Sequence, residues 1–458
     1  MGLRVPRLVI GLVLVVIGSG LTNCATAVAG TTGFELAGEL AAAGGGGSLY
    51  SVSCVSNNNC AAVGFDFNHQ PIYATETRGA WGAVTEVPGS PGGSGYFESV
   101  SCGTARTCTA VGFDAADHAM YADESAGIWS APVELPDPSS AGDSLNSVSC
   151  TSSSDCTAVG FEGTGPEFLP IVVTEAGGAW GPIKVITVPG GNGQLQGVSC
   201  ATARNCTAVG LEGSDQPIAA TETHGAWTPV AVIAGAPGGS AHFNWISCSA
   251  PGDCTAVGFD GESEPIFATQ TAGTWSTAAE VGGSPGGYGF FKGVSCTSRQ
   301  DCTAVGDDWN GQPIYDTEIQ GVWAVPTEIV GTPGGSGFLD GVSCTARTEC
   351  AAVGQDGHSE PLYAVESQPI AQTIAFGPLA DKTLAQSPVV VHASASSGLP
   401  VSFASKSPAV CSSSGPLGAT ITLLKAGICI IQAAQGGDAT YQAAASVDRY
   451  FVVVRAHQ

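Results

Sequence analysis

The stretch that decides the fold runs from Ser51-Val52-Ser53-Cys54 through Cys60-Ala61-Ala62-Val63-Gly64 to Pro71-Ile72-Tyr73-Ala74-Thr75-Glu76. Similar text recurs along most of the chain, and every copy carries two cysteines with five residues between them. These pairs are Cys54/Cys60, Cys102/Cys108, Cys150/Cys156, Cys200/Cys206, Cys248/Cys254, Cys296/Cys302 and Cys344/Cys350. Successive pairs begin 48 residues apart, except for one step of 50 residues between the third and fourth pairs. Repetition at a nearly fixed period indicates a repeat architecture.

Each repeat contains four short β-prone runs separated by turn residues, and none of them has helical periodicity. In the first repeat, the first run ends at Cys54 and the second extends from Cys60 to Phe65. The third run extends from Pro71 to Thr75, and the fourth follows Trp81. Four antiparallel strands within about 40 to 50 residues are typical of a propeller blade. The sequence therefore predicts an all-β fold, a seven-bladed β-propeller of four-stranded blades over residues 30–368.

The two ends of the repeat region predict how the ring of blades closes. A tryptophan follows the second cysteine in the first six repeats, but the seventh repeat reads Gln368-Pro369-Ile370-Ala371 at this place. Before the first repeat, Phe34-Glu35-Leu36-Ala37-Gly38-Glu39-Leu40 matches the outer strand of the other repeats, where Glu86-Val87 stands. We expect residues 33–42 to complete the seventh blade, which removes the open edge between the first and last blades.

The cysteine spacing favours a disulfide across a tight turn between the first and second strands of each blade. A metal site would need four ligands at finger-like spacing, and a redox motif usually separates its cysteines by two residues. The sequence contains neither pattern, so structural disulfides are predicted. For a loop this short, each bridge contributes roughly 2 to 2.5 kcal/mol in the loop-closure model.

Composition restricts the compartment and the partners. The chain has 39 acidic and 14 basic residues and a net charge of -25, which disfavours nucleic-acid binding. Residues 1–29 have the pattern of a secretory signal peptide, with Arg4 and Arg7 before an apolar stretch. The alternative is a lipoprotein signal with Cys24 lipidated, although Asn23 fits poorly before that cysteine. No other stretch approaches the 18 apolar residues of a membrane span, so a secreted or cell-surface protein is expected.

One recurrent hairpin resembles a known motif. Thr75-Glu76-Thr77-Arg78-Gly79-Ala80-Trp81 resembles a shortened Asp-box, the hairpin motif of sialidase-like and sortilin-like propellers. It departs from that motif because the carboxylate is shifted by one place and one residue is missing between glycine and tryptophan. The resemblance implies a structural, non-catalytic role for Glu76 and its equivalents. The whole repeat is similar to secreted bacterial seven-repeat proteins.

Residues 369–458 differ in composition and resemble a bacterial Ig-like domain. The similarity lies in Gln372–Leu379, Ser397–Phe403, Ala426–Cys429 and Gly437–Tyr441. It implies a small β-sandwich with one bridge between Cys411 and Cys429, and a role as a spacer or adhesive module.

Candidate ligand-binding residues are departures from the repeat near the expected channel. The position four residues before each first cysteine forms a mixed polar ring of Tyr50, Glu98, Asn146, Gln196, Asn244, Lys292 and Asp340. Blades 5 and 6 have tryptophans at two positions where no other repeat has one, Trp245 and Trp309. Tyr288 and Phe290 lie in or just after the loop that joins these blades. Together with the nearby carboxylates of Asp307 and Asp308, these aromatic residues suit a sugar or peptide ligand. Core packing between the blades is the alternative interpretation of the aromatic residues.

The tips between the second and third strands are acidic, at Asp66, Asp114, Glu162, Glu212, Asp260, Asp307, Asp308 and Asp356. Turn formation explains such residues, and calcium binding is the alternative.

The main functional hypothesis is a non-catalytic extracellular binding or adhesion protein, monomeric and without cofactor or metal. A second hypothesis is a carbohydrate-active hydrolase or lyase that uses Glu98 and Asp340 as acid and base. A third is a purely structural surface protein.

Overall fold

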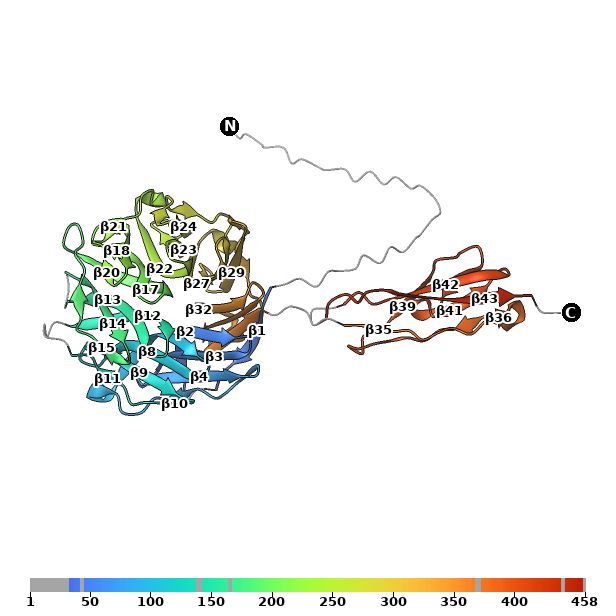
Figure 1. Ribbon diagram of the computed structural model, residues 1–458, viewed down its shortest axis with the longest axis horizontal. Helices are drawn as coiled ribbons and strands as arrows, with labels where there is room; N and C mark the ends of the chain where they lie inside the picture. The colour runs from blue at the N-terminus through green and yellow to red at the C-terminus, as the bar shows by residue number, and fades with distance from the viewer. Residues whose placement is uncertain are drawn as a thin grey trace, which may run out of the picture. The chain divides into compact units, whose positions relative to one another are not determined.

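The computed structural model describes residues 33–41, 45–136, 142–163, 167–366, 372–437 and 441–455, except the side chains of Leu36 and Ala37. The expected signal peptide and Cys24 lie outside the described residues. Contacts divide the described chain into two units, one ending at Glu366 and the other beginning at Gln372 (Figure 1). Both units consist of β-strands and short 3-10 turns, and no described helix is long and apolar enough to cross a membrane.

The first unit contains seven sheets with the same strand order, which we number blades 1 to 7 along the chain. In blade 1, the innermost strand is β2 (Gly47–Ser56), followed outward by β3 (Asn59–Asp66) and β4 (Pro71–Thr77). Two short strands, β5 (Ala80–Trp81) and β6 (Thr85–Glu86), pair with β4 at the outer edge.

Blades 2 to 6 repeat this arrangement of three long strands and a divided outer edge. Their strands are β7 (Gly95–Thr104), β8 (Thr107–Asp114), β9 (Ala119–Ser125), β10 (Ile128–Trp129) and β11 (Val133–Glu134); β12 (Asp143–Ser152), β13 (Asp155–Glu162), β14 (Leu169–Ala176), β15 (Ala179–Trp180) and β16 (Lys184–Val185); β17 (Gly193–Thr202), β18 (Asn205–Glu212), β19 (Pro217–Thr223), β20 (Ala226–Trp227) and β21 (Ala231–Val232); β22 (Ala241–Ala250), β23 (Asp253–Asp260), β24 (Pro265–Thr271), β25 (Thr274–Trp275) and β26 (Ala279–Glu280); β27 (Gly289–Ser298), β28 (Asp301–Asp308), β29 (Pro313–Ile319), β30 (Val322–Trp323) and β31 (Thr327–Glu328).

The hydrophobic core lies between neighbouring blades. Ala61, Ala62 and Val63 of β3 are all nearly inaccessible, since both faces of each sheet are covered by other sheets. Val63 of blade 1, for example, shares one core cluster with Phe97 of blade 2. The strands also approach closely within a blade, because a Cβ at Gly64 would overlap the Ser48 carbonyl oxygen. Glycine at this position of the repeat is therefore a packing requirement.

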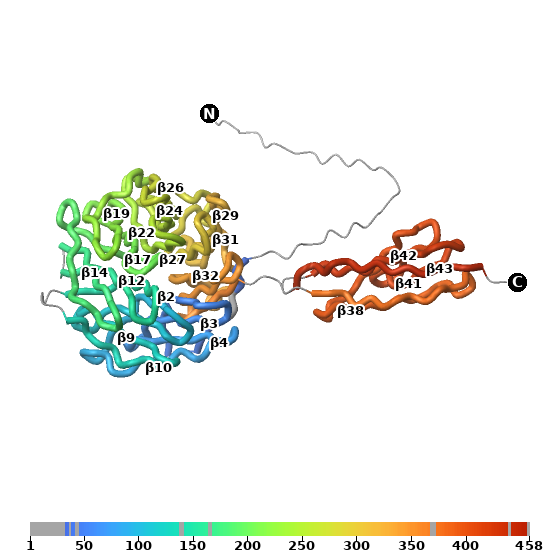
Figure 2. The backbone as a smooth tube through the Cα atoms, viewed as in Figure 1, coloured from blue at the N-terminus to red at the C-terminus, as the bar shows by residue number. Residues whose placement is uncertain are grey.

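A closed circle of hydrogen bonds joins the innermost strands. The backbone N–H of the first cysteine in each blade donates to the serine hydroxyl that precedes the first cysteine of the neighbouring blade, at 2.9–3.0 Å. The accepting serines are Ser53, Ser101, Ser149, Ser199, Ser247, Ser295 and Ser343. The bond from Cys54 to Ser343 joins the first blade to the last, so the circle of bonds is complete. Figure 2 shows the ring that the blades form.

The N-terminal strand β1 (Phe34–Glu39) forms the outer edge of blade 7. It pairs antiparallel with β34 (Pro361–Glu366), which lies outside β33 (Glu349–Asp356) and β32 (Gly337–Ala346). The Phe34/Glu366 and Glu39/Leu362 pairs correspond in register to Trp81/Glu76 and Glu86/Ile72 of blade 1. Residues distant in sequence therefore complete one sheet, and Phe34 occupies the place that tryptophan has in the other blades.

All seven repeat cysteine pairs form disulfides, each between directly opposed residues of the two innermost strands of a blade. These bridges are Cys54–Cys60, Cys102–Cys108, Cys150–Cys156, Cys200–Cys206, Cys248–Cys254, Cys296–Cys302 and Cys344–Cys350. The eighth bridge joins Cys411 to Cys429 in the second unit. This is the pairing that the sequence predicts.

The position of the bridges within the blade corrects the sequence prediction. The sequence predicts strands that end at the first cysteine and resume at the second, but β2 continues to Ser56 and β3 already begins at Asn59. The bridges therefore lie inside the strand pair, and the turn lies beyond them. The second cysteine of each pair is buried, whereas the first is half-buried. The exposed fractions are 5% for Cys60, 4% for Cys108, 2% for Cys156, 1% for Cys206, 3% for Cys254, 3% for Cys302 and 4% for Cys350.

The preceding blade covers these buried sulfur atoms. Cys156 Sγ lies 3.8 Å from Thr109 Oγ1 of blade 2, and Cys206 Sγ lies 3.6 Å from Thr157 Oγ1 of blade 3. Cys254 belongs to a core cluster that includes Val209 of blade 4. The bridges are thus structural parts of the interface between blades, and their second sulfur atoms are not presented to a ligand.

The second unit contains three small sheets around one core. Their strands are β35 (Ile374–Ala375) with β38 (Ser394–Ala395); β36 (Lys382–Thr383), β43 (Val447–Val454), β42 (Gly427–Ala434) and β39 (Ser402–Ser405); and β37 (Val389–Val390), β41 (Thr420–Leu423) and β40 (Cys411–Ser414). The core surrounds the Cys411–Cys429 bridge and includes Phe403, Ile431 and Phe451. One bridge and a few large side chains thus hold this small unit together.

Candidate functional site

The predicted polar ring lies on the innermost strands, and two of its charged members, Lys292 and Asp340, belong to neighbouring blades. Lys292 of blade 6 places its Nζ 3.2 Å from Asp340 Oδ1 of blade 7 and 3.0 Å from Asp307 Oδ1 of its own blade. The same ammonium lies 4.1 Å from the centre of the Phe338 ring. One cation is therefore shared by two carboxylates and an aromatic face.

Burial and neighbouring charges shift the pKa values of this group. Burial raises the pKa of Asp340 to about 6, although the positive charge of Lys292 opposes the rise. Burial also raises the pKa of Glu98 to about 7, and the negative charge of Asp340 adds to this rise. Burial also raises the pKa of Tyr50, and Asp340 and Glu98 contribute. Burial opposes a rise in the pKa of Lys292, but Asp340 and Asp307 raise it through their charges and hydrogen bonds. Tyr50, Glu98, Lys292, Asp307 and Asp340 thus form an acid-rich group, which we call the channel arc, across blades 6, 7, 1 and 2.

Two uncharged members of the ring, Asn146 and Asn244, join neighbouring blades. The Asn146 side-chain amide donates to the Leu195 carbonyl oxygen at 2.9 Å, and Asn244 donates to the Phe291 carbonyl oxygen at 2.9 Å. Gln196 donates to Gln194 within its own strand. The chemistry available to a ligand is therefore concentrated in the channel arc.

Half-buried aromatic residues lie near the channel arc in blades 1 and 2. The Tyr96 ring contacts Phe65 edge to face at 4.5 Å and stacks on Phe113 at 4.9 Å, while Tyr50 contacts Phe65 at 5.2 Å. The Tyr96 hydroxyl also bonds His69 Nδ1 at 2.6 Å. Sequence analysis missed this group, although phenylalanine recurs five residues after the second cysteine in four repeats.

Blades 5 and 6 carry the aromatic residues that the sequence singled out. Trp309 is 64% exposed and Tyr288 is 45% exposed, and their rings lie 5.7 Å apart. Phe290 is half-buried against Phe259, at 5.0 Å. Trp245, in contrast, packs against the core between blades 5 and 6, so the structure favours core packing for this residue.

The carboxylates at the acidic tips mainly accept hydrogen bonds within their own turns. Oδ1 of the tip aspartate accepts a hydrogen bond from the backbone N–H four residues later, at 2.7–2.9 Å, in the tips of Asp66, Asp114, Asp260, Asp308 and Asp356. Asp308 is bonded within its own turn and is only 1% exposed, so it is not presented to a ligand as the sequence interpretation required. Asp307 differs from its neighbour because it reaches Lys292.

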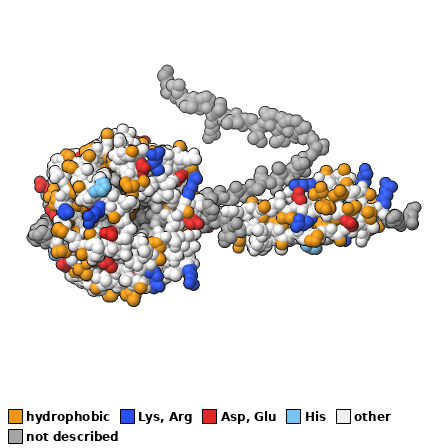
Figure 3. Space-filling view, viewed as in Figure 1, with side chains coloured by type: hydrophobic (Ala, Val, Ile, Leu, Met, Phe, Trp, Pro, Cys, Tyr) orange, Lys and Arg blue, Asp and Glu red, His pale blue; other side chains and the backbone are white. Residues whose placement is uncertain are grey.

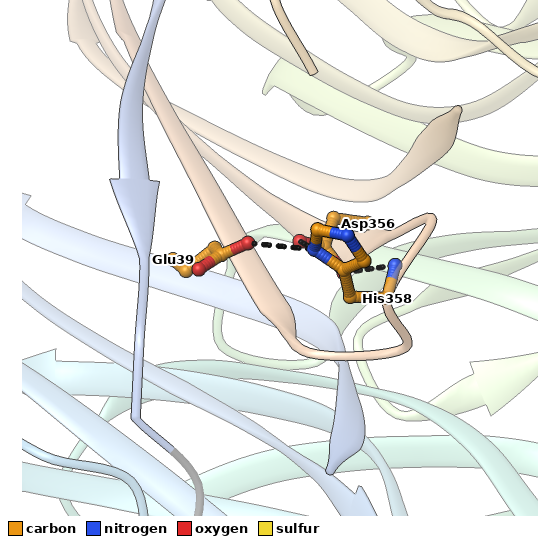
Figure 4. Close-up of side chains that lie close together, drawn as sticks. All are labelled: Glu39, Asp356 and His358. Atoms are coloured by element: carbon orange, nitrogen blue, oxygen red, sulfur yellow. Dashed lines mark hydrogen bonds and ion pairs between the residues drawn. The ribbon is translucent and has the colours of Figure 1, made fainter. Parts of the chain in front are cut away.

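Among the described residues, two clusters, one at the tip of blade 7 and one at the tip of blade 2, combine a histidine with two carboxylates. In one of them, His358 Nδ1 lies 3.3 Å from Glu39 Oε1 and 3.8 Å from Asp356 Oδ2 (Figure 4). The other contains Asp114, His118 and Glu134. The first cluster joins the end of β1 to the tip of blade 7, and His358 also donates its backbone N–H to Asp356. These contacts explain the cluster as part of the blade edge.

No protein-family model matches the sequence, and no curated protein matches it. Among solved structures, the chain is similar to the BP39L lectin from Burkholderia pseudomallei, with 13% identity, coverage of 70% of this chain and 97% of the lectin, and a TM-score of 0.51. YCF48 bound to D1 peptide is 12% identical, with coverage of 73% and 97% and a TM-score of 0.49. The six-bladed propeller lectin of Aleuria aurantia is 10% identical, with coverage of 62% and 97% and a TM-score of 0.41. At these identities the likeness concerns the fold alone, and the circle of four-stranded sheets is a β-propeller.

Proposed function

We propose that the chain is an exported, non-catalytic binding protein whose propeller recognises an extracellular carbohydrate beside the channel arc. Residues 1–29 would direct export, and the eight disulfides suit an oxidising compartment. The second unit would serve as an Ig-like spacer or adhesive module. Anchoring through a lipidated Cys24 is the alternative to release.

The observation that carries this proposal is the exposed Tyr288–Trp309 pair next to charged groups. Trp309 lies two residues from Asp307, and Asp307 contacts Lys292. Sugars present C–H faces that pack on aromatic rings and hydroxyls that bond to carboxylates and ammonium groups. Figure 3 shows acidic and basic side chains scattered over the visible face of the propeller, so an exposed aromatic pair is a more specific feature than overall charge. The lectin similar in fold supports only the point that such a scaffold can carry sugar sites.

Replacing Trp309 by alanine should weaken glycan binding at least roughly tenfold, because an exposed aromatic anchor dominates a small contact. A glycan array would first identify the ligand, and calorimetry would then compare the variants. Phe67→Ala is the matched control, since Phe67 is 51% exposed and follows the tip aspartate of blade 1 as Trp309 does that of blade 6. Equal losses in both variants, or unchanged binding by Trp309→Ala, would reject the site. If the protein binds members of a displayed peptide library but no glycan, its ligand is a peptide and not a carbohydrate.

One observation favours a second candidate function, a hydrolase or lyase. Burial raises the pKa of Glu98 to about 7 and that of Asp340 to about 6, and a pair of carboxylates with shifted pKa values suits acid–base chemistry. The ion pair of Asp340 with Lys292 argues for a binding role instead. If the chain is an enzyme, Glu98→Gln and Asp340→Asn should each lower polysaccharide turnover by roughly 100-fold or more. Absence of turnover together with a bound glycan supports the binding protein, and absence of both supports a purely structural role.

A further inference from the structure

The tip of blade 7 brings together residues from the two ends of the propeller unit. Glu39 ends β1, whereas Asp356 ends β33 and His358 follows it in the tip. Glu39 and His358 are 319 residues apart in the sequence. Figure 4 shows the two carboxylates directed toward the His358 ring. The cluster is therefore assembled only when β1 is in place beside β34.

Both carboxylates approach the same nitrogen atom. His358 Nδ1 lies 3.3 Å from Glu39 Oε1 and 3.8 Å from Asp356 Oδ2. A ring N–H at Nδ1 donates to one acceptor, and the shorter distance assigns this bond to Glu39. The longer distance is outside the range of a hydrogen bond. Asp356 Oδ2 therefore faces the ring nitrogen without being bonded to it.

This oxygen atom is left without a partner in the interior of the tip. Asp356 Oδ1 accepts hydrogen bonds from the backbone N–H groups of His358 and Glu360, both at 2.9 Å. Oδ2 is buried and, within the described chain, accepts no hydrogen bond. Asp356 is only 4% exposed, and no described lysine or arginine lies within 4.0 Å of its carboxylate or that of Glu39. A buried carboxylate oxygen of this kind costs stability unless a cation compensates its charge.

The spacing of the three side-chain atoms is close to that of a tetrahedral metal site. Ligand atoms at about 2.1 Å from a zinc ion are roughly 3.4 Å from one another in this geometry. Here the distances to Nδ1 are 3.3 and 3.8 Å, and all three atoms lie within 4.8 Å of one another. The side chains of Glu39 and His358 are 41% and 63% exposed, so small rotations can shorten the longest distance and water can reach the fourth position.

The types of ligand atom favour zinc over calcium. Imidazole nitrogen and carboxylate oxygen are common zinc ligands, and an open zinc site has three protein ligands and a water molecule. Calcium takes about six to eight oxygen ligands, whereas this cluster offers two carboxylates and a nitrogen. The set is therefore too small and of the wrong type for calcium, which was the alternative for the acidic tips.

The tip of blade 2 provides an internal comparison, because Asp114, His118 and Glu134 form the other such cluster. Here the histidine follows the tip aspartate by four residues instead of two. His118 Nδ1 lies 3.8 Å from Asp114 Oδ2, and no described carboxylate oxygen lies closer to it. In the described chain, neither oxygen of Asp114 is both buried and without a hydrogen-bond partner. This cluster is thus more open, and it serves as a matched control.

We infer that the tip of blade 7 binds one zinc ion through Glu39, Asp356 Oδ2 and His358 Nδ1, with water as the fourth ligand. Nδ1 then presents its lone pair to the ion, and the ring proton is on Nε2. The ion compensates the buried carboxylate and links β1 to the tip that follows β33, so it strengthens the closure of the ring. The site uses none of the residues of the proposed carbohydrate site and does not depend on it.

Calorimetric titration of the chain that begins at Gly30 with zinc chloride at pH 7.5 tests the inference. One zinc ion should bind per chain, and an excess of calcium chloride should not displace it. His358→Gln and Glu39→Gln should each weaken zinc binding at least roughly tenfold, because each removes a ligand. His118→Gln removes the equivalent histidine of blade 2 and should leave zinc binding unchanged. The substituted side chains of blade 7 are largely exposed, so both variants should fold.

Stability measurements separate a site that belongs to the fold from binding to an exposed histidine. The unfolded chain does not hold Glu39 and His358 together, so zinc should raise the guanidinium midpoint of the propeller. This rise should disappear in His358→Gln and persist in His118→Gln. Absence of zinc binding, displacement by calcium, or binding that leaves the midpoint unchanged would overturn the inference. Undiminished binding by His358→Gln or Glu39→Gln, or an equal loss in His118→Gln, would also overturn it.

Discussion

A chain that begins at Gly45, and therefore lacks β1, is expected to lose most of the stability of the propeller and to aggregate. Phe34 is 7% exposed and belongs to the core between blades 6 and 7, whereas Leu40 is 6% exposed and belongs to the core beside blade 1. The segment thus contributes to the cores on both sides of blade 7. Removing two such side chains costs roughly 5 kcal/mol or more. That is a large fraction of the roughly 5 to 15 kcal/mol typical of folded domains.

Loss of β1 also exposes β34 as a free sheet edge. Such an edge presents unpaired backbone groups to other chains, which promotes association. Guanidinium denaturation and size-exclusion chromatography would compare this chain with one that begins at Gly30. All eight tryptophans lie between residues 81 and 323, so their fluorescence reports on the propeller unit. Phe34→Ala should have an intermediate effect and the exposed Glu35→Ala almost none. An unchanged denaturation midpoint in the shortened chain would show that β1 is dispensable for closure.

The position of β1 illustrates what the sequence could predict. The match between Glu39-Leu40 and Glu86-Val87 is a local pattern, and it identifies the segment as an outer strand. The cysteine spacing similarly identifies opposed residues of one hairpin, which the disulfides join. Patterns that repeat within a blade are visible in the sequence because every blade imposes the same local constraints.

Contacts between blades were harder to predict because they join residues about one repeat apart. The arc of Lys292, Asp340 and Glu98 could be anticipated, since these residues share one repeat position. Trp245 shows what the repeat pattern leaves open, since its departure from the repeat allows either a ligand contact or core packing, and the structure shows it packed against the core between blades 5 and 6.

The depth of the disulfides is a further example of a property that depends on the neighbouring blade. The spacing of Cys150 and Cys156 predicts the bridge but not that Cys156 is buried, because Thr109 of another repeat covers its sulfur atom. Cys206 and Cys254 are buried in the same way by the blades that precede theirs. A local pattern therefore predicts which residues pair, and only the closed ring determines how accessible they are.

Refolding without the disulfides is expected to fail or to yield a propeller with little remaining stability. In the loop-closure model each seven-residue ring contributes roughly 2 kcal/mol, so seven bridges contribute up to about 15 kcal/mol. This upper bound equals the whole net stability of a typical domain. The second cysteine of each pair is at most 5% exposed, so the protein should be unfolded, reduced and then refolded in reductant. Tryptophan fluorescence during guanidinium denaturation would measure the result.

Paired substitutions distinguish the bridges of the two units. Cys102→Ala with Cys108→Ala removes one propeller bridge and should lower the free energy of unfolding of the propeller by roughly 2 kcal/mol. Cys411→Ala with Cys429→Ala is the control, since that bridge lies in the core of the second unit and should leave the fluorescence transition in place. A native midpoint in fully reduced protein, verified by titration of the propeller thiols, would contradict the prediction. The serine circle and the cores between the blades would then be sufficient to hold the ring closed without covalent bonds.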